Sequence, residues 1–328
     1  MIHKTPTANM SREEWLQERK KSLGGSDIGA ILGLNEYRSP YSVWADKLGI
    51  IPDQPDNEAM RIGRDLEPYV LSRFAEASGK KTHHVNAILR NDKYPNIHAN
   101  VDSVVIGEKS GVEAKTVSAL GAKKYRDGEF PASYYAQCVA YLAVTEYDRW
   151  YLAALIMGKD FKIYQLTRFK NDLKPDWCES SVYVPQSEID ALALAAYEFW
   201  EHVERKTPPE ADGSAATTEA IHALYPDSDD ETVSLEPVND YIRTYLFLQE
   251  QEKDIAKRLD EAANHIKAYM GQSGRGETKL ASVTWKSYDR SSFDAKAFSA
   301  DNPNADLTKY YKTTSLRRFT VKALEERN

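Results

Sequence analysis

The 328-residue sequence predicts an α/β fold, with a mixed central sheet flanked by helices and a mainly helical C-terminal extension. Helix-like and strand-like segments alternate from about residue 11 to about residue 204, as they do where helices pack on a sheet. Hydrophobic residues make up 41% and aromatic residues 11% of the chain, which is normal for a packed globular core. Beyond residue 236 the pattern changes to that of one long helix.

The elements of the first region follow from capping and periodicity. Ser11-Arg12-Glu13-Glu14 is a capping-box start, which predicts a helix through Trp15. Spacings of three and four residues predict further helices near 26–33, 40–48, 58–78, 118–127, 133–144 and 187–205. Runs rich in β-branched and aromatic residues predict strands near 83–90, 97–106, 111–117, 148–157 and 161–168.

A change of composition separates the two regions. The stretch from Lys206 to Ser214 contains proline and glycine, and an acidic run follows near residue 230, so both indicate a linker. The next helix carries apolar residues at three-four spacing, broken at Glu252, and this stripe could pack on the same chain or on another subunit. We therefore expect three parts, namely a domain over 1–205, a linker over 206–235 and an extension of unassigned role over 236–328.

Composition and charge exclude several classes of protein. The formal net charge of -7 and the pI near 5.6 argue against indiscriminate coating of DNA, although local basic patches can still grip it. The two cysteines, Cys138 and Cys178, are too few and too far apart for a zinc or iron–sulfur framework. The sequence shows no signal peptide and no run near the roughly 18 apolar residues of a membrane helix, so we expect a cytoplasmic protein without membrane association.

Two carboxylates and a lysine converge on a predicted hairpin. Asp102 lies in one β-branched run, and Glu113-Ala114-Lys115 lies in the next, across the turn 107–111. Side chains alternate along a strand, so Glu113 and Lys115 share a face that Asp102 can reach. Adjacent carboxylates repel unless one is protonated or a hard cation neutralises both, and oxygen ligands suit Mg²⁺ or Mn²⁺. The alternative is three surface charges on an ordinary hairpin.

Two predicted helices carry a polar side chain on an apolar face. Glu67 shares a face with Val70 and Phe74, where an unpaired glutamate is costly, so it should meet a cation or a metal-bound water. A boundary glutamate that extends to solvent is equally plausible for this helix alone. Gln137 would be half-buried and could orient a water, or it could be an ordinary core glutamine.

A glycine-rich segment precedes another predicted helix. Gly24-Gly25 leads into a helix capped by Ser26 or Asp27, and the free backbone N–H groups of such a start suit a phosphate. Arg19 lies shortly before it and could add positive charge. A glycine-rich turn with an ordinary cap is the alternative.

Together these segments resemble the YqaJ-type viral recombinase family, which is similar to phage lambda exonuclease and belongs to the PD-(D/E)XK nuclease superfamily. The matching pieces, in order, are Trp15 to Arg19, Gly24 to Asp27, Gly63 to Pro68, Asn100 to Asp102, Glu113 to Thr116 and Tyr134 to Gln137. The resemblance covers residues 11 to 204 and implies the PD-(D/E)XK core. Val101 stands where much of the superfamily has a proline.

The resemblance implies a metal site on the hairpin. Asp102 and Glu113 would bind a catalytic Mg²⁺, together with the carbonyl of Ala114, and Glu67 would add a metal or water contact. Mn²⁺ is the other ion that the site could take. Lys115 would stabilise the attacking hydroxide or the charge that develops on the phosphate, a division of work consistent with the chemistry of metal ions and ammonium groups.

The resemblance also implies how DNA is held and cut. Gln137 would position a water or the scissile phosphate, and Arg19 and Ser26 would hold the terminal 5′-phosphate. The implied activity is a Mg²⁺-dependent 5′-to-3′ exonuclease that acts on double-stranded DNA ends and leaves a 3′ overhang for recombination by strand annealing.

The family also implies a ring-shaped homotrimer, a single-strand annealing protein as partner, and a phage or prophage gene expressed in the bacterial cytoplasm. Two alternatives stay open. One is an endonuclease or a 3′-to-5′ exonuclease on the same core. The other is a non-catalytic DNA-binding or assembly protein, for which the intact set of charged residues gives no support.

Overall fold

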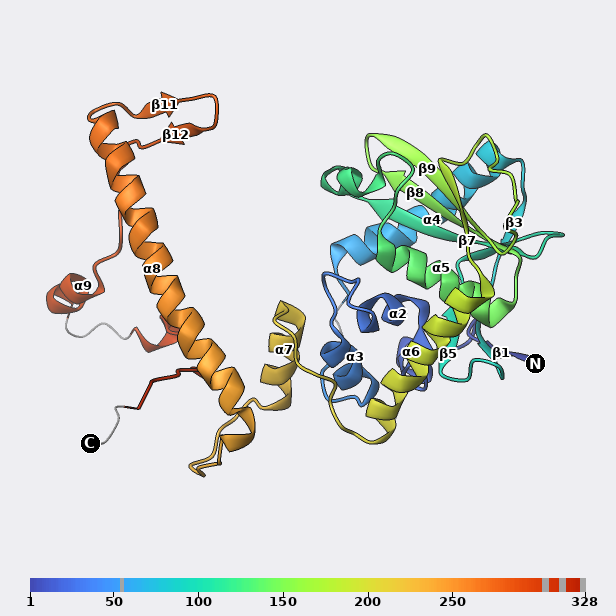
Figure 1. The fold of residues 1–328 in the computed structure, drawn as a ribbon, viewed down its shortest axis with the longest axis horizontal. Helices are drawn as coiled ribbons and strands as arrows, with labels where there is room; N and C mark the ends of the chain where they lie inside the picture. The colour runs from blue at the N-terminus through green and yellow to red at the C-terminus, as the bar shows by residue number, and fades with distance from the viewer. Residues whose placement is uncertain (54–55, 303–306, 313–316, 325–328) are drawn as a thin grey trace. The chain divides into compact units, whose positions relative to one another are not determined.

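A computed structural model describes residues 1–53, 56–302, 307–312 and 317–324. The chain divides into two compact units, Met1–Pro226 and Asp227–Asn328, whose ribbons are drawn in Figure 1. The division falls inside the segment 206–235, for which the sequence predicts a linker. Within the predicted extension, residues 303–306, 313–316 and 325–328 lie outside the described residues.

The first unit contains two sheets. The four-stranded sheet has the order β1-β4-β5-β2 and consists of β1 (Ile2–Pro6), β4 (Ala87–Asn91), β5 (Ile97–Asn100) and β2 (Leu23–Gly24). The six-stranded sheet is mixed, because β7 runs parallel to β8 and β9 runs parallel to β10, while the other neighbours are antiparallel. Its strands, in spatial order, are β10 (Ser180–Tyr183), β9 (Asp160–Thr167), β8 (Arg149–Ile156), β7 (Ser110–Val117), β6 (Ser103–Val105) and β3 (Thr82–His84).

Several helices of the first unit begin at polar capping residues. Ser11 forms the predicted capping box with Glu14, and Ser39, Asn57 and Ser214 also accept a backbone N–H at helix starts. The helical segments are α1 (Arg12–Lys20), α2 (Gly25–Ile31), α3 (Pro40–Lys47), α4 (Glu58–Ser78), the 3-10 helix η1 (Ala119–Tyr125), α5 (Ala132–Thr145), α6 (Gln186–Glu204) and α7 (Ala215–Leu224).

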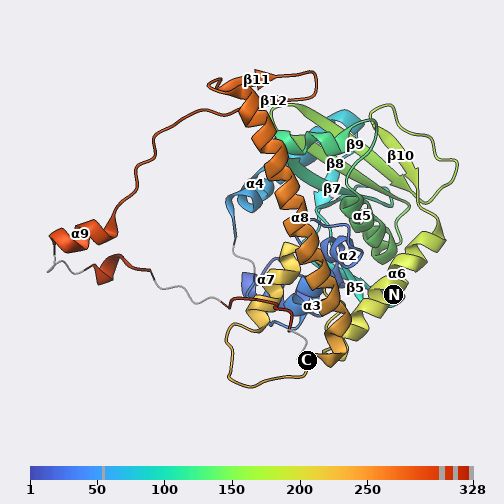
Figure 2. The same ribbon diagram turned by 60° about the vertical axis from the view of Figure 1, so that its left-hand side comes forward.

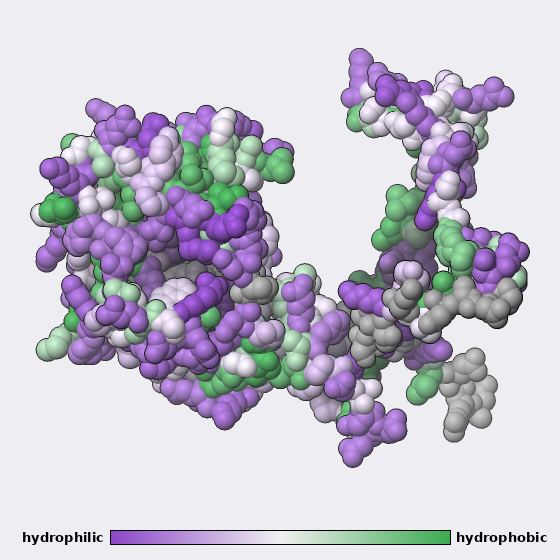
Figure 3. Space-filling model, turned by 180° about the vertical axis from the view of Figure 1, so that it is seen from behind, coloured by the Kyte–Doolittle hydropathy of each residue, from purple (hydrophilic) through white to green (hydrophobic). Residues whose placement is uncertain are grey.

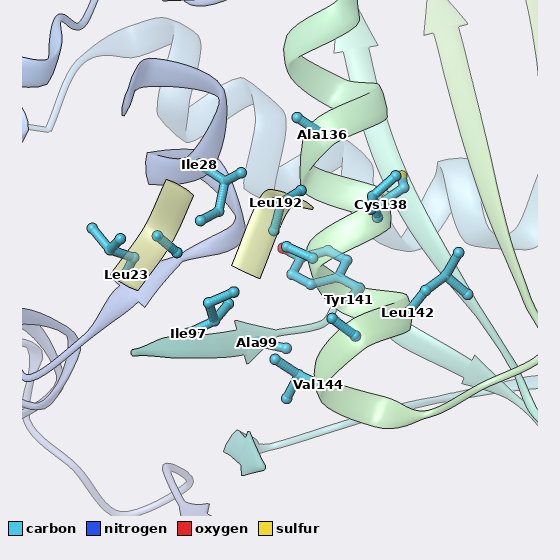
Figure 4. Close-up of a cluster of buried hydrophobic side chains, with 14 of the residues drawn as sticks. Leu23, Ile28, Ile97, Ala99, Ala136, Cys138, Tyr141, Leu142, Val144 and Leu192 are labelled. Carbon is cyan, nitrogen blue, oxygen red and sulfur yellow. The ribbon is translucent and has the colours of Figure 1, made fainter. Parts of the chain in front are cut away.

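Helices cover both faces of the six-stranded sheet, with α4 and α5 on opposite sides (Figures 1 and 2). Side chains of β8 alternate between the two faces: Trp150 and Leu152 pack into the larger core cluster, whereas Tyr151 and Ala153 pack with Phe74 of α4. Helix α5 also packs against β5, and apolar side chains of α2, α5 and β5 point toward one another there (Figure 4). Helix α5 therefore contacts both sheets, close to where β5 leads into β6.

The predicted mixed α/β class is confirmed, and most helices lie where they are expected. Two predicted strands are wrong, because 83–90 and 97–106 each form two strands that belong to different sheets. The predicted helix 118–127 is a short 3-10 helix, and β1, β2, β10 and α7 were not predicted. In both segments the two halves pair with different strands, and this pairing is what separates them.

Helix α7 lies in the predicted linker but belongs to the first unit. It packs against α3, where the Thr217 hydroxyl lies 2.7 Å from the Ser39 hydroxyl and 2.6 Å from a carboxylate oxygen of Asp212. Thr217 is 1% exposed, so this polar contact is buried and fixes the helix in place.

The second unit is built around α8 (Asn239–Met270), which confirms the long predicted helix. The remaining segments are η2 (Glu236–Val238), the paired strands β11 (Arg275–Glu277) and β12 (Ser282–Thr284), α9 (Ala295–Asp301) and η3 (Thr308–Tyr310). Leu248 and Leu259 of the apolar stripe are exposed, whereas Tyr245 contacts the Phe319 ring edge to face. Hydrophobic patches interrupt the hydrophilic surface of this unit (Figure 3). Within the described residues, no helix combines the length and apolar character needed to cross a bilayer.

Candidate active site

The break between β5 and β6 places Asp102 at the junction of the two sheets. β5 ends at Asn100 and β6 begins at Ser103, so Asp102 lies in the link between a strand of each sheet. Its Oδ2 accepts a hydrogen bond of 2.8 Å from the backbone N–H of Ala114 in β7. This bond fixes the carboxylate beside β7.

Glu113 and Lys115 extend from one face of β7, as strand alternation predicts. The Nζ of Lys115 donates to Oε1 of Glu113 at 2.5 Å and lies 4.7 Å from the centre of the Tyr134 ring on α5. Val112 and Ala114 face the other way, toward α4. We call Asp102, Glu113 and Lys115 the carboxylate cluster, and the structure brings its three members together from adjacent segments.

Gln137 joins the carboxylate cluster from α5. Its Nε2 donates to Oε1 of Glu113 and to the Tyr141 hydroxyl, both at 2.7 Å. The Tyr141 hydroxyl in turn donates to the carbonyl of Asn100, the last residue of β5, at 2.9 Å. A chain of hydrogen bonds thus connects the end of β5 to Glu113 through α5.

The charges of the carboxylate cluster are unbalanced. Burial raises the pKa of the Asp102 and Glu113 carboxyls, and the charge of Asp102 raises the pKa of Glu113 further. Burial alone would lower the pKa of Lys115, but Glu113 and Asp102 raise it above its usual value. Lys115 therefore stays charged, while the carboxyl pair favours holding a proton when no further cation is present.

The donor set fits a hard divalent cation. Oε2 of Glu113 is buried and has no hydrogen-bond partner among the described residues. Within the residues that the structure describes, no three His, Cys, Asp or Glu side chains converge closely enough to enclose a metal ion by themselves. A site made of Asp102 and Glu113 would therefore be completed by backbone oxygen and water, which is how Mg²⁺ is commonly bound.

Glu67 approaches the carboxylate cluster from α4. Its Oε1 lies 3.7 Å from Nδ1 of His84, and its side chain is 27% exposed. Burial raises the pKa of the Glu67 carboxyl, and the nearby charge of Glu113 acts in the same direction. A metal or water contact by Glu67 and a metal contact by the Ala114 carbonyl both stay predictions.

The glycine-rich segment packs against α5. A Cβ at Gly25 would lie 2.6 Å from Cε1 of Tyr141, so a larger residue would displace the helix that carries Gln137. Helix α2 begins at Gly25 with Gly24 as its N-cap, so the prediction that Ser26 or Asp27 caps it is wrong. Ser26 is exposed in the first turn, and its phosphate role stays a prediction.

Asp27 instead forms buried ion pairs. Its carboxylate lies 2.5 Å from Nη1 of Arg38 and 2.6 Å from Nζ of Lys47, and it accepts the backbone N–H of Gly24. Burial alone would raise the pKa of Asp27, but Lys47 and Arg38 hold it well below its usual range. Lys47 also donates to the carbonyl of Arg19. We call Asp27, Arg38 and Lys47 the Asp27 network, which ties α1, α2 and α3 together.

Arg19 lines a cavity of about 510 Å³ beside the Asp27 network. Its guanidinium carbon lies 4.5 Å from the centre of the Trp15 ring, and its Nε is buried without a hydrogen-bond partner in the described part of the chain. Neither Ser26 nor Asp102 is among the described residues that line this cavity. The predicted site residues therefore fall into separate groups, and Arg19 belongs to the cavity.

Sequence reasoning missed Tyr141, Tyr134 and the pairing of Asp27. A signal was present for Tyr141, because Gln137 and Tyr141 are four residues apart on one helix face and so lie next to each other. No comparable signal linked Asp27 to Lys47, whose contact depends on the packing of two helices.

Comparisons with known proteins identify the family. Residues 14–148 match the model of the YqaJ-like viral recombinase domain. Over 321 residues the chain is 35% identical to a relative named "Uncharacterized protein YqaJ" from Bacillus subtilis (strain 168), and the match covers 96% of this chain and 95% of the relative. The chain belongs to the YqaJ family. The resemblance drawn from the sequence motifs is thereby confirmed.

The YqaJ-like domain contains both candidate groups, since its match runs from α1 through α5, whereas α6, α7 and the second unit lie beyond it. Two solved structures are also similar. The alkaline exonuclease LHK-Exo from Laribacter hongkongensis is 16% identical with a TM-score of 0.47, covering 60% of this chain and 94% of that chain. A phage related exonuclease from Haemophilus somnus is 12% identical with a TM-score of 0.41, covering 56% and 96%.

Proposed function

We propose that this YqaJ-family protein is a Mg²⁺-dependent nuclease that digests linear double-stranded DNA from its 5′ ends. The observation that carries the proposal is the buried, unpartnered Oε2 of Glu113 beside Asp102, with Lys115 on the same face. A carboxylate pair with an unsatisfied oxygen and an adjacent ammonium suits metal-dependent phosphodiester hydrolysis. The match to a viral recombinase domain supports DNA as the substrate.

Asp102 and Glu113 would hold the Mg²⁺, with the Ala114 carbonyl and Glu67 as further contacts made directly or through water. The bound ion would neutralise the phosphate and lower the pKa of a water. Mn²⁺ also prefers oxygen ligands and would be accepted at the same place. The unbalanced charge of the carboxylate cluster supports a dication here more than it supports a purely structural role.

Lys115 supplies a fixed positive charge to the reacting phosphate. Its ammonium stays charged because two carboxylates raise its pKa, and it is held between Glu113 and the ring of Tyr134. From this position it stabilises the anionic nucleophile and the negative charge that develops on the phosphate. Both N–H groups of the Gln137 amide donate within the protein, to Glu113 and to Tyr141, so Gln137 would position water or phosphate through its hold on Glu113.

The 5′-to-3′ polarity is proposed from Arg19 of α1 and Ser26 of α2. Arg19 would bind the terminal 5′-phosphate, for which the guanidinium N–H groups are well suited, and Ser26, which does not line the Arg19 cavity, keeps its phosphate role as a prediction of the family resemblance. Ser26 follows Gly25, which packs on α5 next to Tyr141, so a phosphate at Ser26 would lie beside the helix that carries Gln137. Digestion from the 5′ end would leave a 3′ single strand for annealing.

The homotrimer and the single-strand annealing partner remain predictions of the family resemblance. Light scattering of the purified protein would test the first, and co-purification with a candidate annealing protein would test the second.

Digestion of linear duplex DNA labelled separately at each end tests the proposed function. Wild-type protein should release the 5′ label first with Mg²⁺ and release nothing with EDTA, and Asp102→Ala should be inactive. Asp65→Ala, which removes an exposed carboxylate of α4, is the matched control and should digest normally. Earlier loss of the 3′ label would establish the opposite polarity, and cutting of closed circles would establish an endonuclease. No digestion by folded wild-type protein would refute the proposal.

A further inference from the structure

The second unit has no buried core of its own. Among the residues that the structure describes from 227 to 324, none is buried, and the buried apolar side chains end at Ala220 in the first unit. Helix α8 is 32 residues long, which is about 48 Å at the rise of an α-helix. Most of the stability of a helix in a protein comes from packing of its apolar face. Helix α8 therefore requires a partner surface.

The apolar face of α8 repeats in alternating steps of four and three residues. We call it the α8 stripe, and its positions are Tyr241, Tyr245, Leu248, Glu252, Ile255, Leu259, Ala262, Ile266 and Tyr269. A face with this spacing drifts by about 20° per heptad on a straight helix, so over four heptads it does not stay on a flat surface. It stays in contact with a second helix, because the two helices supercoil around each other. The spacing thus identifies the partner as a helix of similar length.

Within the described chain, no other helix is available for this role. The helices next in length are α4, with 21 residues, and α6, with 19. Both already pack their apolar faces in the first unit, as Phe74 of α4 and Phe199 of α6 show. On the α8 stripe, by contrast, Leu248 and Leu259 are 57% and 65% exposed. The matching helix is therefore the α8 of a second copy.

Glu252 decides the direction of such a pair. In a parallel pair in register, each stripe residue lies beside its own copy, as the a and d residues of parallel coiled coils do. The two Glu252 carboxylates would then meet inside the apolar core of the pair, where two like charges are costly. An antiparallel pair separates them, because each layer combines different residues of the two helices.

One antiparallel register makes the α8 stripe complementary to itself. Its layers combine Leu248 with Ile266, Glu252 with Ala262, and Ile255 with Leu259, each layer occurring twice. Glu252 then lies beside a methyl group, and Arg258, one turn before Ala262 on the partner helix, supplies the opposite charge. In the same register Ala256 lies beside its own copy near the two-fold axis, where a small side chain lets the helices approach closely.

We propose that two copies of this chain pair through their α8 helices as an antiparallel coiled coil with two-fold symmetry. The interface uses the same surface of both copies, as two-fold pairs do. It lies in the second unit, outside the residues 14–148 that match the YqaJ-like domain, so it adds to any assembly that the first unit forms. The pairing does not depend on the proposed nuclease function.

Light scattering of the full chain over a series of concentrations tests the proposal. Wild-type protein should have at least twice the mass of Leu259→Glu, which places a carboxylate opposite Ile255 in two layers. Asn264→Glu is the matched control, because it introduces the same charge at an exposed position on the opposite side of α8. It should keep the wild-type mass. Circular dichroism shows whether the helix content of the two variants is the same.

Glu252→Leu gives an opposite test, and it decides the question alone if Leu259→Glu loses its helix. It replaces a carboxylate with an apolar side chain in two layers, so sedimentation equilibrium should show a Kd of pairing at least about tenfold lower. An unchanged Kd, or equal masses of wild type and folded Leu259→Glu, would overturn the proposal. A lower thermal transition of Leu259→Glu at unchanged mass would show that the stripe packs within one chain instead.

The distance between two spin labels tests the antiparallel direction. The label is attached at Lys267→Cys, since Cys138 and Cys178 are both buried. In the proposed register residue 267 of one copy lies opposite residue 247 of the other, so the two labels are separated by about 30 Å along the helix axis. A parallel pair would hold them at the same height, within about 20 Å, or two helix diameters. That short distance would refute the antiparallel pairing.

Discussion

The carboxylate cluster and the Asp27 network are both buried, but their charges are balanced differently. In the Asp27 network Asp27 meets two cations, and one of them, Arg38, also pairs with Asp46 at 2.9 Å, so the charges balance and the pKa of Asp27 is held below its usual range. In the carboxylate cluster two carboxylates meet one lysine, and the pKa of each carboxyl is raised. Buried charges need compensation, so the first group is complete within the protein and the second needs a further cation. Charge balance therefore distinguishes a structural group from a candidate active site at similar burial.

Removing the lysine from the carboxylate cluster should have the largest effect. Lys115→Ala should lower the rate of DNA cleavage by about 10³-fold or more, because it removes a fixed positive charge beside the reacting phosphate. DNA binding should be largely retained. The measurement is single-turnover cleavage at saturating DNA, together with fluorescence anisotropy in EDTA.

The control for Lys115→Ala is Lys109→Ala, an exposed lysine in the turn of the same hairpin. It should cleave at the wild-type rate. Wild-type turnover by Lys115→Ala would refute the assignment of Lys115 and would make the carboxylate cluster an ordinary buried ion group.

Breaking the Asp27 network should reduce stability strongly. Asp27→Ala leaves Lys47 and Arg38 without their shared carboxylate, and removing one partner of buried ion pairs costs about 3–5 kcal/mol. The thermal transition of the first unit should fall by about 6–20 °C at roughly 2–4 °C per kcal/mol. Asp65→Ala is the exposed control. If the transition temperature of Asp27→Ala falls no further than that of Asp65→Ala, the network contributes little to the stability of the fold.

Contacts between residues close together in the chain were predicted better than contacts between residues far apart in it. Glu113 and Lys115 lie on one strand of a hairpin and Asp102 directly precedes the other, so strand alternation and closeness in the chain were enough to expect them together. The division of 97–106 at Asp102 was not predictable in this way, because β5 and β6 are separated by pairing with β4 and β7, which no local pattern specifies.

The same reasoning explains the other differences. Asp27 looked like a helix cap because its partners, Lys47 on α3 and Arg38 just before α3, come near it only through packing that was unknown. Helix α7 was assigned to a linker because it is short, rich in alanine and flanked by glycine and proline. Its place is decided by the buried contact between Thr217 and Ser39, which are 178 residues apart in the chain.

The pH dependence of stability should have opposite signs in the two groups. The raised pKa of Asp102 and Glu113 means that metal-free folded protein holds protons that the unfolded chain loses near pH 4, so this stability falls as pH rises toward neutrality. Asp27, with its lowered pKa, stabilises above pH 4 and loses this contribution only in stronger acid. Calorimetry in EDTA from pH 4 to 8 measures the first effect, and continuing the series down to about pH 2 measures the second.

Asp102→Asn sharpens this test, because it removes the repulsion between the carboxylates of residues 102 and 113 and keeps the shape of the side chain. In EDTA at pH 8 it should raise the stability of the first unit by about 1–2 kcal/mol while abolishing cleavage. Added Mg²⁺ should stabilise the wild-type protein more than the variant. A variant that is less stable than wild type at pH 8 would show that the carboxylate pair is already compensated.

The smallest expected effect concerns the connection between β5 and Glu113. The Tyr141 hydroxyl accepts from Gln137 and donates to Asn100, so Tyr141→Phe removes both bonds but keeps the ring that packs on Trp150. We expect a loss of about 0.5–1.5 kcal/mol, seen as a roughly two- to twelvefold lower kcat. KM should stay unchanged, because Tyr141 positions Gln137 and contacts no substrate group.

Two further variants decide between positioning and packing at Tyr141. Tyr141→Leu, which also removes the ring, should lower the thermal transition of the first unit well below that of Tyr141→Phe. Gln137→Ala should lower kcat at least as much as Tyr141→Phe, and adding Tyr141→Phe to it should cost little more, since both act through one chain of hydrogen bonds. If the free-energy losses of the two variants simply add, Tyr141 acts independently of Gln137. The hydrogen bonds from the end of β5 then do not hold Glu113 in position through Gln137.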